Sequence, residues 1–222
     1  MPLSSGLPTP GGDSGDWGTI LNTYLEKNIP NVANVKGFGA HSTTEPGYET
    51  FDSTVAIQAA IDSATTGGVI FFPAGVYKIT SALSITKDDT KLVGAHRELS
   101  QLKTFGNNAL DLSGTVGSLK RVSVENLTIW ESVNTNVISI GINVTAYAQE
   151  TAFRNLRVYS FGGSNIIMRG GLNTIIEHCY FSLPKATAGG HNLWVYRSAT
   201  DTSPTTLRTI GNYFASNTNP KS

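Results

Sequence analysis

The sequence contains a single cysteine, has no excess of charge of either sign, and lacks long apolar runs. Cys179 is the single cysteine, which excludes an internal disulfide framework and a multi-cysteine metal site. The 16 Lys and Arg residues match the 16 Asp and Glu residues, so no basic field exists and we expect no nucleic-acid partner. No apolar run reaches the roughly 18 residues that a transmembrane helix needs, and we expect no membrane span.

Charged residues make up only 14% of the chain, whereas 39% are hydrophobic and come in organised runs, which indicates a folded body. Residues 1–16 are rich in Pro, Gly and Ser and predict an extended arm. Apolar residues then recur at helical spacing over 17–27, which predicts a short amphipathic helix. We therefore predict an N-terminal attachment arm over 1–30 and a second domain over 31–222.

The second domain begins with a helical pattern and continues in strands. Asp52 is predicted to cap a helix over STVAIQAAIDSAT, which Gly67 and Gly68 end. The apolar stripe of this helix is Ile57, Ala60, Ile61 and Ala64. From Gly68 the period changes to two, and GVIFFPAGVYKI predicts a strand, a turn and a second strand. We expect residues 31–66 to form an N-terminal cap and 67–222 to form coils.

An imperfect repeat is the most informative feature of the remaining sequence. Its copies carry mostly apolar residues at positions one, four and six. They begin 29, 23 and 33 residues apart and are VENLTI (124–129), FRNLRV (153–158), IEHCYF (176–181) and TIGNYF (209–214). A second strand type begins with Asn in NVISI (136–140), NIIMR (165–169) and NLWVY (192–196). Imperfect periods built of short strands predict a solenoid.

Physical reasoning favours a right-handed parallel β-helix over the alternative, a β-sandwich in which the repeat is a coincidence. One coil cannot bury its own apolar face, whereas coils stacked about 4.8 Å apart pair their strands and bury a continuous interior column. Asn in the turns tolerates a left-handed backbone and can hydrogen-bond to its neighbour one coil away. We therefore predict an all-β solenoid with an N-terminal capping helix and an extended N-terminal arm.

Two stretches of sequence resemble known families. In order, GFGA (37–40), STVAIQAAIDSA (53–64) and GGVIFFPAGVYKI (67–79) resemble the start of the pectate-lyase-like, single-stranded β-helix proteins. LPTPGGDSGDWGTILNTYLE (7–26) is similar to N-terminal segments of phage tail and tail-fibre proteins. Together the two resemblances imply a phage tail appendage of the tailspike type with a β-helical body.

The resemblance implies enzymes that act on polysaccharides, and these need clustered acids. Hydrolases use paired carboxylates about 5–9 Å apart, and lyases use acidic clusters that hold Ca²⁺. The only Asp-Asp pair, Asp88-Asp89, lies in a predicted turn between lysines and is expected to be solvated. From 121 onward the acids are scattered, as Glu125, Glu131, Glu150, Glu177 and Asp201. No catalytic residue is therefore identified, and a polysaccharide lyase or glycoside hydrolase stays an alternative.

The register of the repeat places other residues on the outer surface. At position two, Glu125, Arg154 and Glu177 are expected to form an alternating charge ladder rather than a catalytic group. An outward patch is expected from positions five and seven, and its members are Trp130, Arg157, Tyr159, Tyr180 and Tyr213. Such residues suit carbohydrate binding by stacking and hydrogen bonding, and they also suit a subunit interface, which we favour.

The remaining candidate side chains predict structural roles. Cys179 takes an interior position and is expected to be an inert core thiol. His178 takes the Asn position of the repeat, and His191 precedes the strand NLWVY, assigned as an inner strand, so turn roles are expected for both. With His41 and His96, they show no metal-ligand spacing, and we expect neither a metal nor a cofactor.

These observations predict a structural, receptor-interaction component of a phage tail appendage, located in the virion. It would attach to other tail or baseplate proteins through residues 1–30, form a homotrimer, and present its β-helix to host-surface polysaccharide. The alternatives are an extracellular bacterial protein, a polysaccharide-cleaving enzyme, and a non-catalytic carbohydrate-binding β-helix. The polar end ASNTNPKS offers no helix to cover the last coil, which predicts a truncated chain or a covering partner.

Overall fold

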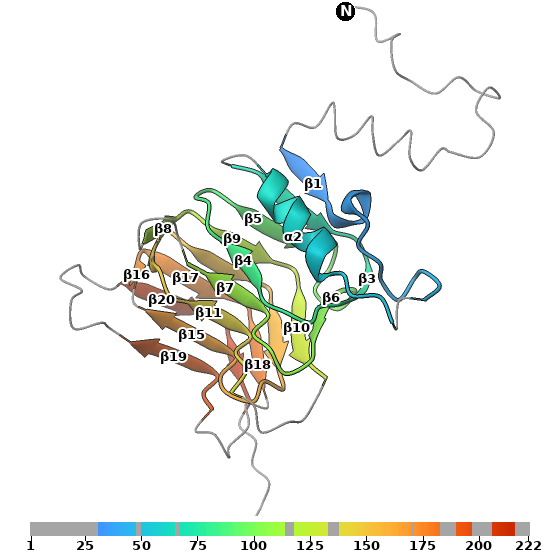
Figure 1. Cartoon of the computed structure of the whole chain (residues 1–222). Helices are drawn as coiled ribbons and strands as arrows, with labels where there is room; N and C mark the ends of the chain where they lie inside the picture. Colours follow the sequence, from blue (N-terminus) through green and yellow to red (C-terminus); the bar gives the residue numbers. More distant parts are fainter. Residues whose placement is uncertain are drawn as a thin grey trace, which may run out of the picture.

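The computed structural model describes residues 31–47, 50–64, 67–113, 118–132, 138–169, 171–182, 190–196 and 206–215. The arm predicted over 1–30, with its short helix, lies outside these ranges. Within them the chain winds repeatedly around one interior, and strands of successive coils lie side by side in parallel sheets (Figure 1). The predicted parallel β-helix is confirmed.

Four parallel sheets make up the walls of this stack. Sheet I contains β1 (Val32–Asn34), β2 (Val69–Phe72), β5 (Lys91–Gly94), β9 (Ser123–Glu125), β13 (Ala152–Arg154), β17 (Thr174–Glu177) and β20 (Leu207–Ile210). Sheet II contains β3 (Gly75–Lys78), β6 (Ser100–Thr104), β10 (Thr128–Glu131), β14 (Arg157–Tyr159), β18 (Tyr180–Ser182) and β21 (Tyr213–Phe214). Sheet III contains β4 (Leu83–Ile85), β7 (Leu110–Leu112), β11 (Ile142–Val144), β15 (Ile166–Arg169) and β19 (Leu193–Tyr196). Sheet IV contains β8 (Ser118–Lys120), β12 (Tyr147–Gln149) and β16 (Gly171–Leu172).

The register of sheet I confirms the four-copy repeat. Phe153 lies opposite Val124 on one side and Ile176 on the other, and Ile176 lies opposite Thr209. Phe153 and its equivalents at positions one, four and six are buried in the first three copies. In the fourth copy Phe214 is 46% exposed, although its ring stacks on that of Phe181. The apolar pattern therefore forms a continuous interior through the first three copies, and the fourth copy is partly exposed.

A column of left-handed residues turns the chain from sheet I to sheet II in each of these coils. Asn126, Asn155, His178 and Gly211 have φ of 58°, 49°, 53° and 59°. Asn155 Nδ2 donates a hydrogen bond to Asn126 Oδ1 at 2.8 Å, so the side chains also bond from coil to coil. The turn role predicted for Asn and for His178 is confirmed, because all of these residues have a left-handed backbone. Asn and Gly, which occupy three of the four positions, tolerate this backbone region best.

A second left-handed column precedes sheet I, and its residues are Asp89, Arg121, Glu150 and Asn173. The turn predicted at Asp88-Asp89 is the first member of this column. Asp88 Oδ1 accepts from Lys120 N at 2.9 Å, and Asp89 pairs with the Arg121 guanidinium. The Asp-Asp pair therefore joins neighbouring turns.

The predicted helix is α2 (Thr54–Ser63), which lies across the β1 end of the stack beside the 3-10 helix η1 (Val35–Phe38) (Figure 1). Its stripe of Ile57, Ala60, Ile61 and Ala64 is buried. The predicted boundaries need correction. Ser53 is the N-cap residue, while Asp52 Oδ1 accepts from Thr54 N at 3.0 Å, and the helix ends at Ser63 rather than at Gly67.

The assignment of NVISI (136–140) as a strand is wrong. Residues 138–140 form no strand, and β11 begins at Ile142, which lies opposite Ile166. The position equivalent to Asn165 is therefore Gly141, not Asn136. A Cβ at Gly141 would lie 2.5 Å from the Asn165 carbonyl oxygen, so this coil requires glycine where the next two coils have Asn. Matching the coils by Asn alone shifted this strand.

Candidate functional site

Sheet II brings together all five residues of the predicted outward patch. Arg157, Tyr180 and Tyr213 lie opposite one another on β14, β18 and β21. Trp130 and Tyr159 form the neighbouring column on β10 and β14. We call these five residues the cation–aromatic stripe. Tyr213 is the most open of its rings, at 59% exposure.

The rings of the stripe stack on one another in two pairs. The Trp130 and Tyr159 centroids lie 5.9 Å apart with an interplanar angle of 2°, and those of Tyr180 and Tyr213 lie 4.9 Å apart at 11°. The Arg157 guanidinium lies 4.9 Å from the Tyr159 centroid and 5.6 Å from that of Tyr180. Each ring of the stripe therefore has another ring stacked on it, and Tyr213 remains the most exposed member.

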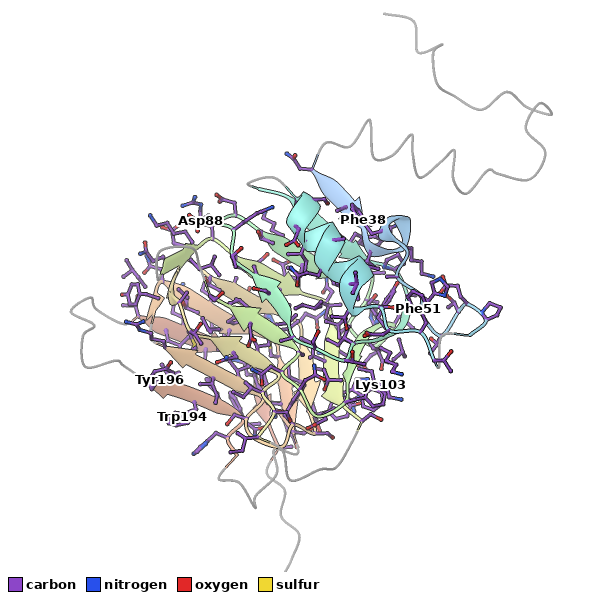
Figure 2. The ribbon with its side chains drawn as sticks, viewed as in Figure 1. Phe38, Phe51, Asp88, Lys103, Trp194 and Tyr196 are labelled. Atoms are coloured by element: carbon purple, nitrogen blue, oxygen red, sulfur yellow. The ribbon has the colours of Figure 1, made fainter. Side chains whose placement is uncertain are left out.

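Lysines extend this arrangement toward the β3 end of sheet II. Lys103, labelled in Figure 2, has its ammonium 5.1 Å from the Trp130 ring centroid and 5.2 Å from that of Phe105. Lys78, directly opposite Lys103, also lies 5.2 Å from the Phe105 centroid. At this end of the sheet, cations and rings thus alternate from Lys78 to Trp130.

The loop before β6 fixes the guanidinium at the centre of the stripe. Arg157 Nη1 lies 3.1 Å from Glu98 Oε2, and Glu98 also pairs with Arg97. Burial acts to raise the pKa of Glu98, but the hydrogen bonds from Arg97 and Arg157 outweigh it and hold that pKa below its usual value. The stripe is therefore held in place by contacts on both sides of Arg157.

A second aromatic surface lies on sheet III, where the sequence predicted no site. Trp194 is 49% exposed on β19, and Figure 2 shows it beside Tyr196. Its coil neighbour is Ile167, so no ring from the preceding coil stacks on it. The nearest rings are tilted: His191 lies 5.6 Å away at 36°, and Tyr196 lies 6.1 Å away at 51°. Within the described residues, no ring therefore stacks face to face on the indole.

This surface was missed because NLWVY was assigned as an inner strand. Leu193 and Val195 pack against the core, and Trp194 and Tyr196 alternate with them. Successive side chains of a strand point to opposite faces. The alternation of aliphatic and aromatic residues was therefore the signal that two rings face outward.

The charge ladder predicted on sheet I is confirmed. Arg154 Nε lies 2.5 Å from Glu177 Oε1, and Arg154 Nη1 lies 3.3 Å from Glu125 Oε1. The hydrogen bond to Glu177, followed by the charge of Glu125, raises the pKa of Arg154. Glu125 and Glu177 are therefore engaged in pairing across coils.

The other acids of the coils do not gather around them. Glu131 points inward at the end of β10, and its Oε2 accepts from Ser139 Oγ at 2.6 Å and from Gly162 N at 2.9 Å. Glu150 is exposed in a turn, and Asp201 lies outside the described residues. Among the described residues, no group of three or more His, Cys, Asp or Glu is placed to hold a metal ion.

Cys179 is a core residue, as predicted. It is 2% exposed, and burial raises the pKa of its thiol to about 11. The thiol is therefore protonated at neutral pH, and reaction requires the thiolate.

No helix in the described part of the chain is long and apolar enough to cross a bilayer.

Parallel sheets stacked coil upon coil, with left-handed turn columns and a capping helix, define a right-handed parallel β-helix protein. Residues 32–217 match the family model described as rhamnogalacturonase A/epimerase, pectate lyase-like. The chain belongs to this family. The resemblance carried by residues 37–79 is thereby confirmed.

Solved structures share the fold at low sequence identity. The ORF18 protein of Geobacillus virus E2 is 24% identical, with a TM-score of 0.72 over 90% of this chain. The catalytic unit of a GH87 α-1,3-glucanase from Streptomyces thermodiastaticus is 21% identical, with a TM-score of 0.53 over 82% of this chain. The matches cover 39% and 35% of those two proteins, so this chain corresponds to well under half of each. A search of curated proteins found no match.

Proposed function

We propose that this protein is a polysaccharide-contacting component of a phage tail appendage, of the tailspike or fibre type, located in the virion. Its membership of a pectate-lyase-like family supports a polysaccharide ligand. The similarity of residues 7–26 to phage tail segments supports the phage assignment, and a virus encodes one of the solved proteins that share the fold. In this proposal residues 1–30 attach the chain to other tail or baseplate proteins, and the β-helix meets host-surface polysaccharide.

The observation that carries the glycan contact is the half-exposed indole of Trp194. Aromatic faces bind sugar rings by stacking, and neighbouring polar groups fix the orientation. Trp194 has no ring stacked on it from the preceding coil, and Tyr196 adds a second outward ring on the same strand. We place the sugar here because no ring of the described residues stacks face to face on Trp194, whereas the rings of the cation–aromatic stripe stack in pairs.

The cation–aromatic stripe is then assigned to the subunit surface of a homotrimer. Tyr, Trp and Arg are enriched at protein interfaces, and a rigid array loses little conformational freedom on association. Sedimentation of the full chain at micromolar concentration should give the mass of a trimer. The variant Tyr213→Glu, which places a charge in the most exposed part of the stripe, should shift the distribution toward monomer. A monomeric wild-type chain would contradict this assignment.

A matched pair of tryptophan variants tests the glycan contact. The full chain is screened on an array of bacterial surface polysaccharides, and binding to the best glycan is compared for Trp194→Ala and Trp130→Ala. We expect Trp194→Ala to weaken binding at least tenfold, because it removes the open indole face. We expect Trp130→Ala to leave binding within about twofold, since its ring is enclosed in the stripe.

The reverse pattern would move the glycan site to the stripe, and no binding to any polysaccharide would refute the proposed function. Release of reducing ends or unsaturated products from the bound glycan is measured in the same samples. Cleavage by the wild-type chain would replace the proposal with the enzymatic alternative, a polysaccharide lyase or glycoside hydrolase.

A further inference from the structure

A hollow of about 400 Å³ lies on the outer face of sheet I, away from both aromatic surfaces. Its floor follows one column of facing residues on successive strands, in which Lys91 is followed by Ser123, Ala152 and Ile175. The two central side chains are the smallest of the four. The hollow exists because a small pair in the column stands between two long side chains.

The rims of this hollow alternate in charge both along and across the coils. One rim comes from the left-handed turn column and contains Arg121 and Glu150. The opposite rim is the charge ladder, with Glu125 and Arg154. Arg121 and Glu125 flank one strand and Glu150 and Arg154 flank the next, so each of these two coils contributes one acid and one base.

Several polar groups around the hollow keep unused hydrogen-bonding capacity. The Ser123 hydroxyl on the floor is buried and has no hydrogen-bond partner within the described residues. A buried hydroxyl left unbonded costs about 1–3 kcal/mol, which a ligand oxygen could recover. The Glu150 carboxylate interacts with the charge of Arg121 but makes no side-chain hydrogen bond within the described part of the chain. Arg121 uses Nε and Nη2 on Asp89, which leaves Nη1 for a ligand.

We infer that this hollow binds an uncharged sugar residue. Three bases, Lys91, Arg121 and Arg154, and two acids, Glu125 and Glu150, line it, so a ligand of either charge meets like charges as well as opposite ones. A sugar hydroxyl both donates and accepts, and can bond to carboxylates and guanidinium groups alike. The Ala152 methyl and the Ile175 side chain offer an apolar floor for the ring, and the volume falls within the range of small-molecule sites. This site lies on a different sheet from Trp194 and goes beyond the proposed function.

Amide chemical shifts of the full chain, labelled with ¹⁵N, test the inference. The probes are methyl glycosides of glucose, galactose and mannose, with glucuronate as the charged comparator. We expect at least one uncharged glycoside to shift amides of β9, β13 and β17, and to bind at least tenfold more tightly than glucuronate. Ala152→Phe, which fills the hollow, should weaken binding at least tenfold. Val93→Phe, a similar enlargement on β5 outside the hollow, should leave it within about twofold.

Two further variants test the same site if Ala152→Phe does not fold. Ser123→Ala and Glu150→Gln preserve side-chain size and should each weaken binding about threefold or more. No shifts at these amides, preferred binding of glucuronate, or unchanged binding in all three variants would overturn the inference. Loss of glycan binding in Trp194→Ala with these shifts retained would separate the two sites. Retained polysaccharide binding without the shifts would refute the hollow and leave the proposed function standing.

Discussion

Replacing Asn155 tests whether the left-handed turn column holds the stack together. Asn155 has a φ of 49°, and its side chain makes two hydrogen bonds. Arg97 Nη1 donates to Asn155 Oδ1 at 3.1 Å, and Asn155 Nδ2 donates to Asn126 Oδ1 at 2.8 Å. Asn155→Ala removes both bonds and leaves a residue that disfavours this backbone. Asn155→Gly removes the same bonds but accepts the backbone.

The size of each effect follows from these contacts. Two side-chain hydrogen bonds at about 0.5–1.5 kcal/mol each contribute about 1–3 kcal/mol. The left-handed backbone adds about 1–2 kcal/mol for Ala, whereas Gly loses about 0.5–1 kcal/mol through the freedom of its unfolded chain. We therefore expect Asn155→Ala to lower the unfolding free energy by about 2–5 kcal/mol. Asn155→Gly should be more stable than Asn155→Ala by about 0.5–1 kcal/mol.

The unfolding free energy of both variants is measured by urea denaturation, with circular dichroism as the signal. The same two substitutions at Asn143 are the matched control. Asn143 lies on β11 with a backbone outside the left-handed region, and its Nδ2 donates to Asp111 Oδ1 at 3.0 Å. There the order should reverse, with Gly less stable than Ala, because glycine weakens a strand. If Asn155→Ala were as stable as Asn155→Gly, or if both positions gave the same order, the argument from the left-handed column would be refuted.

Three other predictions follow from the described contacts. A double-mutant cycle on Arg154→Ala and Glu177→Ala should give a coupling of about 0.2–1 kcal/mol that shrinks in high salt; no coupling at low salt would argue against the ladder. Cys179 should resist iodoacetamide at pH 7.5 in the folded protein and react in urea, because burial raises its pKa to about 11; fast labelling of the native chain would contradict this. The hydrogen bond from Arg121 holds the pKa of Asp89 below 3.8, so its stabilisation is complete above that value and is lost as pH falls through the lower folded pKa. Acid unfolding of Asp89→Asn should therefore show a shallower pH dependence than wild type, and an equally steep curve would exclude the Asp89 contribution.

The interior of the coils was predictable because its pattern is local. Apolar residues at positions one, four and six of each copy place Val124, Phe153 and Ile176 in one buried column, and the structure confirms that register. The strand next to Gly141 was not predictable in the same way. Its place depends on which residue faces Asn165 in the neighbouring coil, and glycine occupies that position. A pattern based on Asn alone does not contain that information.

The candidate sites were predictable in composition but not in geometry. The register of the repeat gathered the stripe residues correctly, yet their stacking depends on side-chain orientation between coils. The hollow on sheet I depends on Ser123 and Ala152, which directly precede the first two copies of the repeat and face each other in its register. The repeat pairs these two small residues, but the space left between the long side chains beside them depends on side-chain packing in three dimensions.

In this parallel β-helix, many outward aromatic and charged side chains contact the equivalent side chains of neighbouring coils. On sheet II, Trp130 stacks on Tyr159, and on sheet I, Arg154 joins two glutamates, so regular columns satisfy their own members. We then expect ligands to bind where a residue of a different type or size breaks such a column of matching side chains. Trp194 follows Ile167 and keeps an open face, and the Ser123–Ala152 pair leaves a hollow between charged rims. Restoring regularity is therefore a direct test of this principle: Ile167→Tyr, which gives Trp194 a stacking partner, should stabilise the coil while weakening glycan binding at sheet III.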